Sequence, residues 1–394
     1  MYRIGKEEVK EIEKVIESKK LFRVGDPKTG HQQEVNRFEK EWAEKIGSKF
    51  ALCMSGGGTA ALICGLVGLE IGPGDEVIVP GYTFMATAIA VLAVGAIPVI
   101  AEVDETLTID TENIKKKITP QTKAVIPVHM VGLPSNMSEI IDIAKKHNLK
   151  IMEDCCQADG GSYKNKRLGR WGNAGAFSFN DFKILSCGEG GALVTDNKKI
   201  YERALIYHDS GTTFWPYTEK FSEPIFIGQQ FRASEIMGAI LRIQLQRLDG
   251  ILTDLRKIKK IFYNELSGKP GVKFAKSNDI DGDCGVVVAF QFDNEKDARK
   301  FAVAEGVGGW LPIDTGRHMY FNWEPILEKR MGPNKALNPF YFPENKNLRT
   351  AYTKDMCPKT TDITSRTVFI SSNPDWTDQQ IKDKILFCKK ALGI

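Results

Sequence analysis

Short apolar runs alternate with helical or loop segments from residue 50 onward. The runs that we interpret as buried strands are 50–54, 76–79, 97–103, 124–128, 149–152 and 174–179. Strands separated by helices predict a largely parallel sheet between helices, with ligands at the carboxyl ends of the strands. At 394 residues the chain is too long for one ordinary core, so we expect a large domain and a smaller one.

Two of these runs lead to residues with a clear chemical use. The run 149–152 delivers Asp154, and the run 174–179 delivers Ser178 and, shortly after it, Lys183. Taken alone, such an aspartate is more often a helix cap, and a lysine is usually a solvated side chain. Together they supply three things that pyridoxal phosphate needs: a carboxylate to keep the pyridine nitrogen protonated, an amine to form a Schiff base, and a hydroxyl for the phosphate.

A glycine-rich turn, Ser55-Gly56-Gly57-Gly58-Thr59, separates the first strand from an expected helix over 60–69. Glycines let the backbone approach an anion, and the free amide groups at a helix start carry a partial positive charge. Such turns are common and by themselves indicate only a tight connection. Because this one precedes Asp154 and Lys183, we treat Gly58 and Thr59 as candidates for binding the cofactor phosphate.

Three short patterns carry a family resemblance: E-D-x-x-Q-A at 153–158, F-S-F-x-x-x-K at 177–183 and G-E-G-G at 188–191. In combination they resemble the DegT/StrS family of sugar aminotransferases, and the likeness extends over essentially the whole chain. The resemblance implies an α/β fold, the fold type I of pyridoxal phosphate-dependent transferases. Such a fold has a mostly parallel sheet flanked by helices and a smaller C-terminal α+β domain.

The resemblance also implies roles for individual residues. Lys183 would form the Schiff base and then act as the base that moves a proton. Asp154 would bind the pyridinium, and Gln157 would bind the ring hydroxyl oxygen. Phe84 aligns with the aromatic residue that lies against the cofactor ring, although core packing alone would also explain a phenylalanine there.

The family further implies a homodimer with shared active sites. Gln230 stands where relatives carry an asparagine that reaches the cofactor phosphate of the neighbouring subunit, and the aromatic, turn-rich stretch 212–217 suits a loop at a subunit boundary. The sequence departs from the family at Asp159, where many relatives have histidine. Cys155 and Cys156 replace small residues, for which we expect a packing role.

We expect a large pyridoxal phosphate-binding domain over 1–248 and a small C-terminal domain over 249–394. Helical spacing of apolar residues predicts helices over 6–19 and 33–46, and this N-terminal part is able to pack on the small domain. The expected elements of the small domain are a strand at 286–292 and helices at 295–305 and 378–391.

Charge and composition exclude several other classes of function. A formal charge of +4 without a basic block argues against a nucleic-acid partner. The start has no apolar core and no run is long enough to span a bilayer, so we expect a cytoplasmic protein without a membrane partner. The 8 cysteines lack the paired short spacings of a zinc site, and we expect no metal.

The reaction that follows from the resemblance is transfer of an amino group from L-glutamate to a keto or aldehydo sugar. The residues at 128–130, 228–230 and 318–322 resemble those of enzymes that aminate the C8 aldehyde of 3-deoxy-manno-octulosonate, a sugar of lipopolysaccharide. Its carboxylate would need a cation, for which Arg232 and Arg317 are candidates, with His318 nearby in sequence. Either arginine would equally suit a surface ion pair.

Other substrates and reactions stay open. One alternative is a nucleotide-linked 4-keto or 3-keto deoxysugar. Another is a dehydratase: Lys183 argues against the sugar dehydratases that have histidine there, but not against lyases that keep the lysine. A ligand-binding sensor on the same fold is an alternative from a different class.

Overall fold

The protein is described by a computed structural model over residues 3–211 and 221–394. Its centre is a seven-stranded sheet in the order β1-β9-β8-β5-β4-β2-β3. The strands are β1 (Phe50–Met54), β2 (Glu76–Pro80), β3 (Ile97–Ala101), β4 (Thr122–Val125), β5 (Lys150–Asp154), β6 (Ser162–Tyr163), β7 (Lys166–Arg167), β8 (Ala174–Ser178), β9 (Gly191–Thr195), β10 (Val287–Gln291) and β11 (Thr367–Ser371). Within the large sheet only β9 runs antiparallel to its neighbours, β1 and β8. The predicted, mostly parallel sheet is confirmed.

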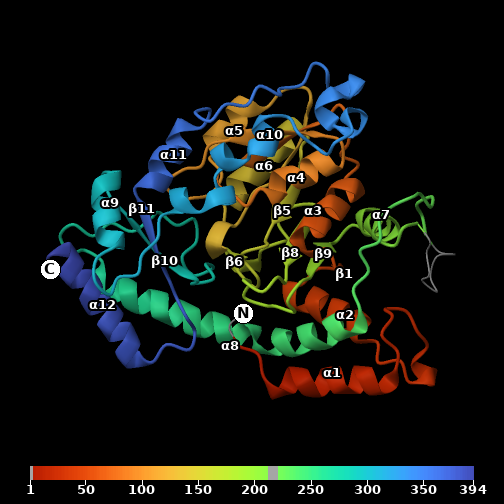
Figure 1. Cartoon of the computed structure of the whole chain (residues 1–394), viewed down its shortest axis with the longest axis horizontal. Coiled ribbons are helices and arrows are strands. Elements are labelled where there is room, and N and C mark those ends of the chain that lie inside the picture. Colours follow the sequence, from red (N-terminus) through yellow and green to blue (C-terminus); the bar gives the residue numbers. More distant parts are fainter. Residues whose placement is uncertain (1–2, 212–220) are drawn as a thin grey trace.

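Helices cover both faces of this sheet (Figure 1). They are α1 (Lys6–Ser18), α2 (Glu34–Ile46), α3 (Gly57–Gly68), α4 (Ala86–Ala93), α5 (Thr111–Lys117), α6 (Met137–His147), α7 (Lys198–His208), α8 (Glu235–Leu266), α9 (Glu295–Ala302), α10 (Glu324–Leu327), α11 (Pro358–Ser365) and α12 (Asp378–Leu392). Side chains alternate along a strand, so Met152 and Ala176 join the core of α3, α4 and α7, whereas Ile151 and Phe177 join that of α2, α6 and α8. The result is a three-layer α/β unit.

The helices predicted over 6–19 and 33–46 are confirmed as α1 and α2. Two elements differ from the prediction. Helix α3 begins at Gly57, inside the predicted turn. The prediction placed the start later because glycine has a low helix propensity. Strand β9 was not predicted; it begins at Gly191, inside the pattern G-E-G-G at 188–191, which we had interpreted only as a family motif.

The C-terminal part is built on the antiparallel pair β10–β11, with α9 and α12 packed around it. Helix α8 runs without a break through residues 248 and 249, from beside α2 to beside α12 (Figure 1). The boundary expected at 248/249 therefore lies inside one long helix that serves both cores. The division into two domains stays a prediction.

Between α9 and β11 the chain forms short 3-10 turns rather than long helices. They are Pro312–Asp314, Gly316–His318, Tyr320–Asn322, Lys335–Leu337, Pro339–Tyr341 and Pro343–Asn345. This segment returns to the large sheet: the Asn345 amide binds the Gly95 carbonyl (2.8 Å), and Arg349 forms an ion pair with the buried Glu76. None of the helices formed by the described residues has the length and apolar character needed to cross a bilayer.

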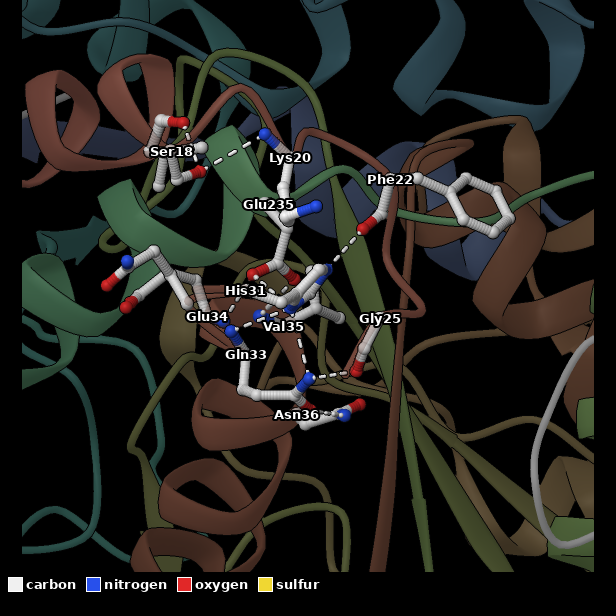
Figure 2. A network of polar contacts seen from close by, with 12 residues as sticks. Ser18, Lys20, Phe22, Gly25, His31, Gln33, Glu34, Val35, Asn36 and Glu235 are labelled. Carbon is white, nitrogen blue, oxygen red and sulfur yellow. Dashed lines mark hydrogen bonds and ion pairs between the residues drawn. The ribbon is translucent and has the colours of Figure 1, made fainter. Parts of the chain in front are cut away.

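A buried polar network ties the start of α2 to the start of α8. Figure 2 shows the Glu235 carboxylate at the first turn of α2, where it accepts the backbone N–H groups of Glu34 (2.6 Å) and Val35 (3.2 Å). His31 lies beside it, donates from Nε2 to the Phe22 carbonyl (2.7 Å), and accepts at Nδ1 from the Gln33 amide (3.1 Å). A residue about two hundred positions away thus caps α2.

We predict that Glu235→Ala lowers the free energy of unfolding by about 1–3 kcal/mol, because it leaves two buried N–H groups without an acceptor. Urea denaturation followed by circular dichroism measures the change. Glu328→Ala is the control, since Glu328 lies in an exposed ion pair with Arg330, whose loss should cost less than about 0.5 kcal/mol. Equal stabilities of the two variants would contradict the capping role.

Candidate active site

The loops that follow β1, β2, β4, β5 and β8 meet at one edge of the sheet and enclose a cavity of about 610 Å³. This is the edge at which α/β folds bind ligands. The predicted cofactor residues that line the cavity are Gly58, Thr59, Phe84, Asp154, Gln157, Ser178 and Lys183. Residues Val286, Val287 and Ser371 of the C-terminal part complete the wall.

Asp154 is the last residue of β5, and its carboxylate is held from both sides. Its Oδ2 accepts from the Thr87 hydroxyl (2.8 Å), and its Oδ1 accepts from the Cys156 amide (3.1 Å). Its backbone is bonded to Pro127 and His129, in the segment that follows β4. The side chain is 4% exposed, so a buried carboxylate with a fixed direction faces the cavity.

Lys183 lies in the connection between β8 and β9, where its amide donates to the Asn180 carbonyl (2.9 Å). The side chain is half-buried and lines the cavity. Among residues 3–211 and 221–394, the Lys183 amine has no hydrogen-bond or ion-pair partner. An amine without a partner beside a fixed carboxylate is a suitable group for covalent attachment of a ligand.

The turn before α3 forms a cradle of backbone amide groups. Gly57 has φ +69°, and a Cβ at Gly58 would lie 2.4 Å from the Cys156 Sγ, so the start of the helix approaches the end of β5 as only glycine permits. The Ser55 amide donates to the Phe231 carbonyl, and the Ala60 amide donates to the Gly56 carbonyl. In the part of the chain that the structure describes, the amides of Gly57, Gly58 and Thr59 have no acceptor, which leaves them for a ligand. Ser178, the last residue of β8, adds a hydroxyl at the same place.

Gln157 is oriented by a residue that the sequence did not single out. Its Oε1 accepts from the Val131 amide (3.1 Å), so the side-chain NH₂ group is left to donate to a ligand. Val131 has φ +46°, which is strained for a β-branched residue. Strain of this kind is typical of functional sites. Here the strained backbone conformation directs the Val131 N–H toward the Gln157 side chain.

Phe84 and His318 form one wall of the cavity. Their ring centroids are 5.3 Å apart, and the backbone around His318 is bonded to the backbone around Phe84: the Thr83 amide donates to the His318 carbonyl (2.9 Å). Burial lowers the pKa of His318, and the nearby Lys183 charge lowers it further, against a hydrogen bond to Thr315. The imidazole is therefore neutral near pH 7.

Three other predicted site residues lie outside the cavity of their own chain. Arg232 forms an ion pair with Asp209 (2.6 Å) and lies against the Phe22 ring. Arg317 is exposed, and its carbonyl accepts from Met85. Gln230 is exposed as well. The stretch 212–217 lies outside the described residues.

A buried group of His129, Glu153 and Cys155 lies behind Asp154 and was not predicted. The Glu153 carboxylate accepts from the amides of Gly169, Trp171 and Gly172 and from the His129 Nε2, whose other ring nitrogen accepts from Ser135. These donors satisfy the glutamate, so the group functions as a hydrogen-bonded support for the strand that carries Asp154. The contact between His129 and Glu153 could not be predicted, because the two residues are distant in the sequence and belong to no common motif.

Asp159 is fully buried next to the lysine loop. One oxygen accepts weakly from the Leu185 amide (3.4 Å), and the other has no partner in the described part of the chain. Burial raises the pKa of Asp159 well above its usual range, although the Leu185 amide and the Lys183 charge act in the opposite direction. Burial likewise raises the pKa of the Cys155 and Cys156 thiols, which stay un-ionised.

The raised pKa of Asp159 predicts a pH-dependent stability. The folded protein keeps the Asp159 proton while the unfolded chain releases it above about pH 4, so rising pH removes stability. Asp159→Asn lacks this titration. The stability of Asp159→Asn relative to the wild type, measured as the difference in their free energies of unfolding, should therefore increase from about pH 5 to about pH 8.

Urea denaturation of the cofactor-free protein across this range measures the effect, with the surface variant Asp281→Asn as control. A difference between Asp159→Asn and the wild type that does not change with pH would show that Asp159 is ionised in the folded protein.

Comparison with known proteins identifies the family. The DegT/DnrJ/EryC1/StrS aminotransferase family matches residues 2–307. The spore coat polysaccharide biosynthesis protein SpsC of Bacillus subtilis (strain 168) is 31% identical over 393 residues, which cover 97% of this chain and 93% of that protein. The dTDP-3-amino-3,4,6-trideoxy-alpha-D-glucose transaminase of Streptomyces venezuelae is 38% identical over 241 residues, which cover 61% of this chain and only 62% of that enzyme.

Solved structures agree with the sequence comparison. The aminotransferase from Psychrobacter cryohalolentis superposes with a TM-score of 0.81 at 25% identity and covers 100% of this chain and 98% of that one. S. venezuelae DesV, in complex with a ketimine intermediate, gives a TM-score of 0.77 at 27% identity, covering 98% and 95%. The predicted fold type, enzyme class and cofactor are confirmed. The chain belongs to the DegT/DnrJ/EryC1/StrS aminotransferase family and is a pyridoxal phosphate-dependent sugar aminotransferase.

Proposed function

We propose that the protein binds pyridoxal phosphate in the cavity beside Lys183 and transfers an amino group from L-glutamate to a carbonyl carbon of a sugar. The observation that carries the proposal is the pairing of an unpartnered lysine amine with a fixed, buried carboxylate in one cavity. When bound, the cofactor supplies a carbonyl carbon that accepts the amino group and a ring that withdraws electrons.

Each residue has a physical role in this proposal. The Asp154 carboxylate accepts the N–H of the ring nitrogen and keeps the proton there. Gln157 donates from its NH₂ group to the ring hydroxyl oxygen, and Phe84 lies against the ring. The amides at Gly58 and Thr59, with the Ser178 hydroxyl, bind the phosphate.

Lys183 has two roles. Its amine attaches the cofactor at rest, and once displaced by the donor it takes the proton from the donor's α-carbon. A lysine amine suits this second role because, once released from the cofactor, it would have a free lone pair to accept that proton. The same amine returns a proton when the sugar takes up the amino group.

His318 is the substrate-binding residue that the geometry supports best. It lines the cavity, contacts Phe84 and is neutral, so it can exchange hydrogen bonds with sugar hydroxyl groups. Phe182, 87% exposed at the same cavity, offers an apolar face to a sugar ring. Neither Arg232 nor Arg317 lines the cavity of its own chain, so a substrate carboxylate would need a cation from elsewhere.

Two classes of sugar fit this arrangement. The C8 aldehyde of 3-deoxy-manno-octulosonate is our first candidate, because the residues at 128–130, 228–230 and 318–322 resemble those of enzymes that act on it. A nucleotide-linked keto sugar is the second, because the printed names of several relatives, such as GDP-perosamine synthase of Vibrio cholerae, refer to nucleotide-linked sugars.

We predict that purified, cofactor-loaded enzyme converts L-glutamate to 2-oxoglutarate over many turnovers only when a carbonyl sugar is present, because without the sugar the reaction stops once the cofactor has taken up the amino group. A panel of both sugar classes, followed by detection of 2-oxoglutarate and of the aminated sugar, tests this. Lys183→Ala should lose at least about a thousandfold in rate, because it removes both the attachment point and the base. Lys123→Ala, on the surface, is the control and should keep full activity. Unimpaired turnover by Lys183→Ala would contradict the proposal.

We further propose that the enzyme is a homodimer in which each chain completes the partner's site. Support comes from the position of Gln230, which is exposed and outside its own cavity, although its family position belongs to a phosphate contact. A self-complementary contact about a two-fold axis places the same segment beside both cofactors.

Complementation tests the shared site. We predict that mixing Lys183→Ala with Gln230→Ala, under conditions of subunit exchange, restores activity above that of either parent. Each hybrid dimer would contain one site with both defects and one with neither. Exchange is measured separately, by isolating mixed dimers formed from two differently tagged chains. Demonstrated exchange without recovered activity, with Gln230→Ala alone clearly impaired, would place Gln230 in its own chain's site.

A further inference from the structure

Two threonine hydroxyl groups connect the Asp154 carboxylate to the wall that carries His318. Thr87, in the first turn of α4, lies 2.8 Å from Asp154 Oδ2, and Thr83 Oγ1 lies 2.8 Å from Thr87 Oγ1. Both threonines are 1% exposed. The Thr83 amide is in turn bonded to the His318 carbonyl. The chain of contacts therefore runs from the substrate wall to the aspartate.

The direction of the hydrogen bonds follows from what each group can do. An ionised carboxylate only accepts, so Thr87 has to donate its single hydroxyl proton to Asp154. The oxygen of Thr87 is then left to accept, and Thr83 donates to it. The other acceptor in reach, the Phe84 carbonyl, is more distant from both hydroxyls, at 3.3 Å and 3.5 Å. The short contacts thus favour donation from Thr83 through Thr87 to Asp154.

Hydrogen bonds donated to an ionised carboxylate favour the ionised form. A second hydroxyl behind the first strengthens the donor, because bonded groups polarise one another. In this site the hydrogen bonds fix the direction of the Asp154 carboxylate. A carboxylate fixed in this way would accept the N–H of a ring nitrogen facing it, and the ring would withdraw electrons only while it keeps that proton.

We propose that Thr87 is a positioning residue that acts through Asp154, and that Thr83 orients and strengthens its hydroxyl. The inference rests on the proposed role of Asp154. Thr87 lines the cavity, and its single hydroxyl proton is used in the bond to Asp154. The hydroxyl fixes the direction of the carboxylate, so its loss should affect the reaction through the aspartate.

Thr87→Val tests the proposal, because it keeps the shape of the side chain and removes the hydroxyl. We expect the rate of the half-reaction with L-glutamate to fall about tenfold to a hundredfold, the range for losing a hydrogen bond to a charged group. Thr83→Val should cost about twofold to tenfold, since its bond is to a neutral group. Thr87→Ser should recover most of the rate.

Two measurements separate this role from a merely structural one. The dissociation constant of pyridoxal phosphate, by equilibrium dialysis, should rise in Thr87→Val. In a double-mutant cycle, Thr87→Val should have less than about a twofold effect in the Asp154→Asn background, because the carboxylate through which it acts is gone. Thr364→Val is the matched control, as it removes a buried hydroxyl that bonds only to carbonyls of its own helix.

The outcomes are distinguishable. If Asp154→Asn is impaired but Thr87→Val reacts within about twofold of wild type, or if the two effects multiply in the double variant, the role of Thr87 is wrong and that of Asp154 stands. If Asp154→Asn itself reacts at the wild-type rate, the proposed function of Asp154 is wrong, and this inference falls with it. Circular dichroism and the urea midpoint show whether each variant is folded.

Discussion

A buried carboxylate at the end of β5 is the constraint on which the site depends. Removing a charge from water is costly unless donors replace the water. Asp154 meets this requirement through Thr87 and the Cys156 amide, and its backbone is bonded to the neighbouring strand end. Behind it, Glu153 binds three amides of the loop at 169–172 and the His129 ring. The hydrogen bonds that make the charge tolerable also fix where it points.

Segments far apart in the sequence meet around that carboxylate. The first turn of α3, the lysine loop between β8 and β9, and the wall around His318 all reach one cavity, although they lie more than two hundred residues apart at the extremes. The parallel strands bring most of them together, because their carboxyl ends share an edge. The C-terminal segment joins them through backbone bonds to the residues around Phe84. One wall of the cavity, around His318, thus comes from the chain's last third, whereas the lining residues from Gly56 to Glu189 come from its first half.

The sequence predicted those candidate residues that belong to recognisable local motifs. Asp154 and Lys183 follow apolar runs that are typical of strands, and Gly58 lies in a glycine-rich turn that became a candidate phosphate site because it precedes them. The sequence did not predict Thr87, Val131 or the His129–Glu153 pair, because their partners lie across the fold and no periodicity records such contacts. The substrate-binding roles of Arg232 and Arg317 stay predictions: both suit a carboxylate by type, but Arg232 pairs with Asp209 and Arg317 is exposed, outside the cavity of its own chain. The residue type predicts which groups a side chain can bind, whereas the tertiary structure determines which groups lie next to it.

We propose that pyridoxal phosphate is attached to Lys183. The most direct test is to load purified protein with pyridoxal phosphate, reduce it with borohydride, digest it and analyse the peptides by mass spectrometry. We expect a yellow protein that loses its colour on reduction and a single modified peptide that carries the cofactor on Lys183. An adduct on a different lysine, or no adduct on a protein that has bound the cofactor, would contradict it.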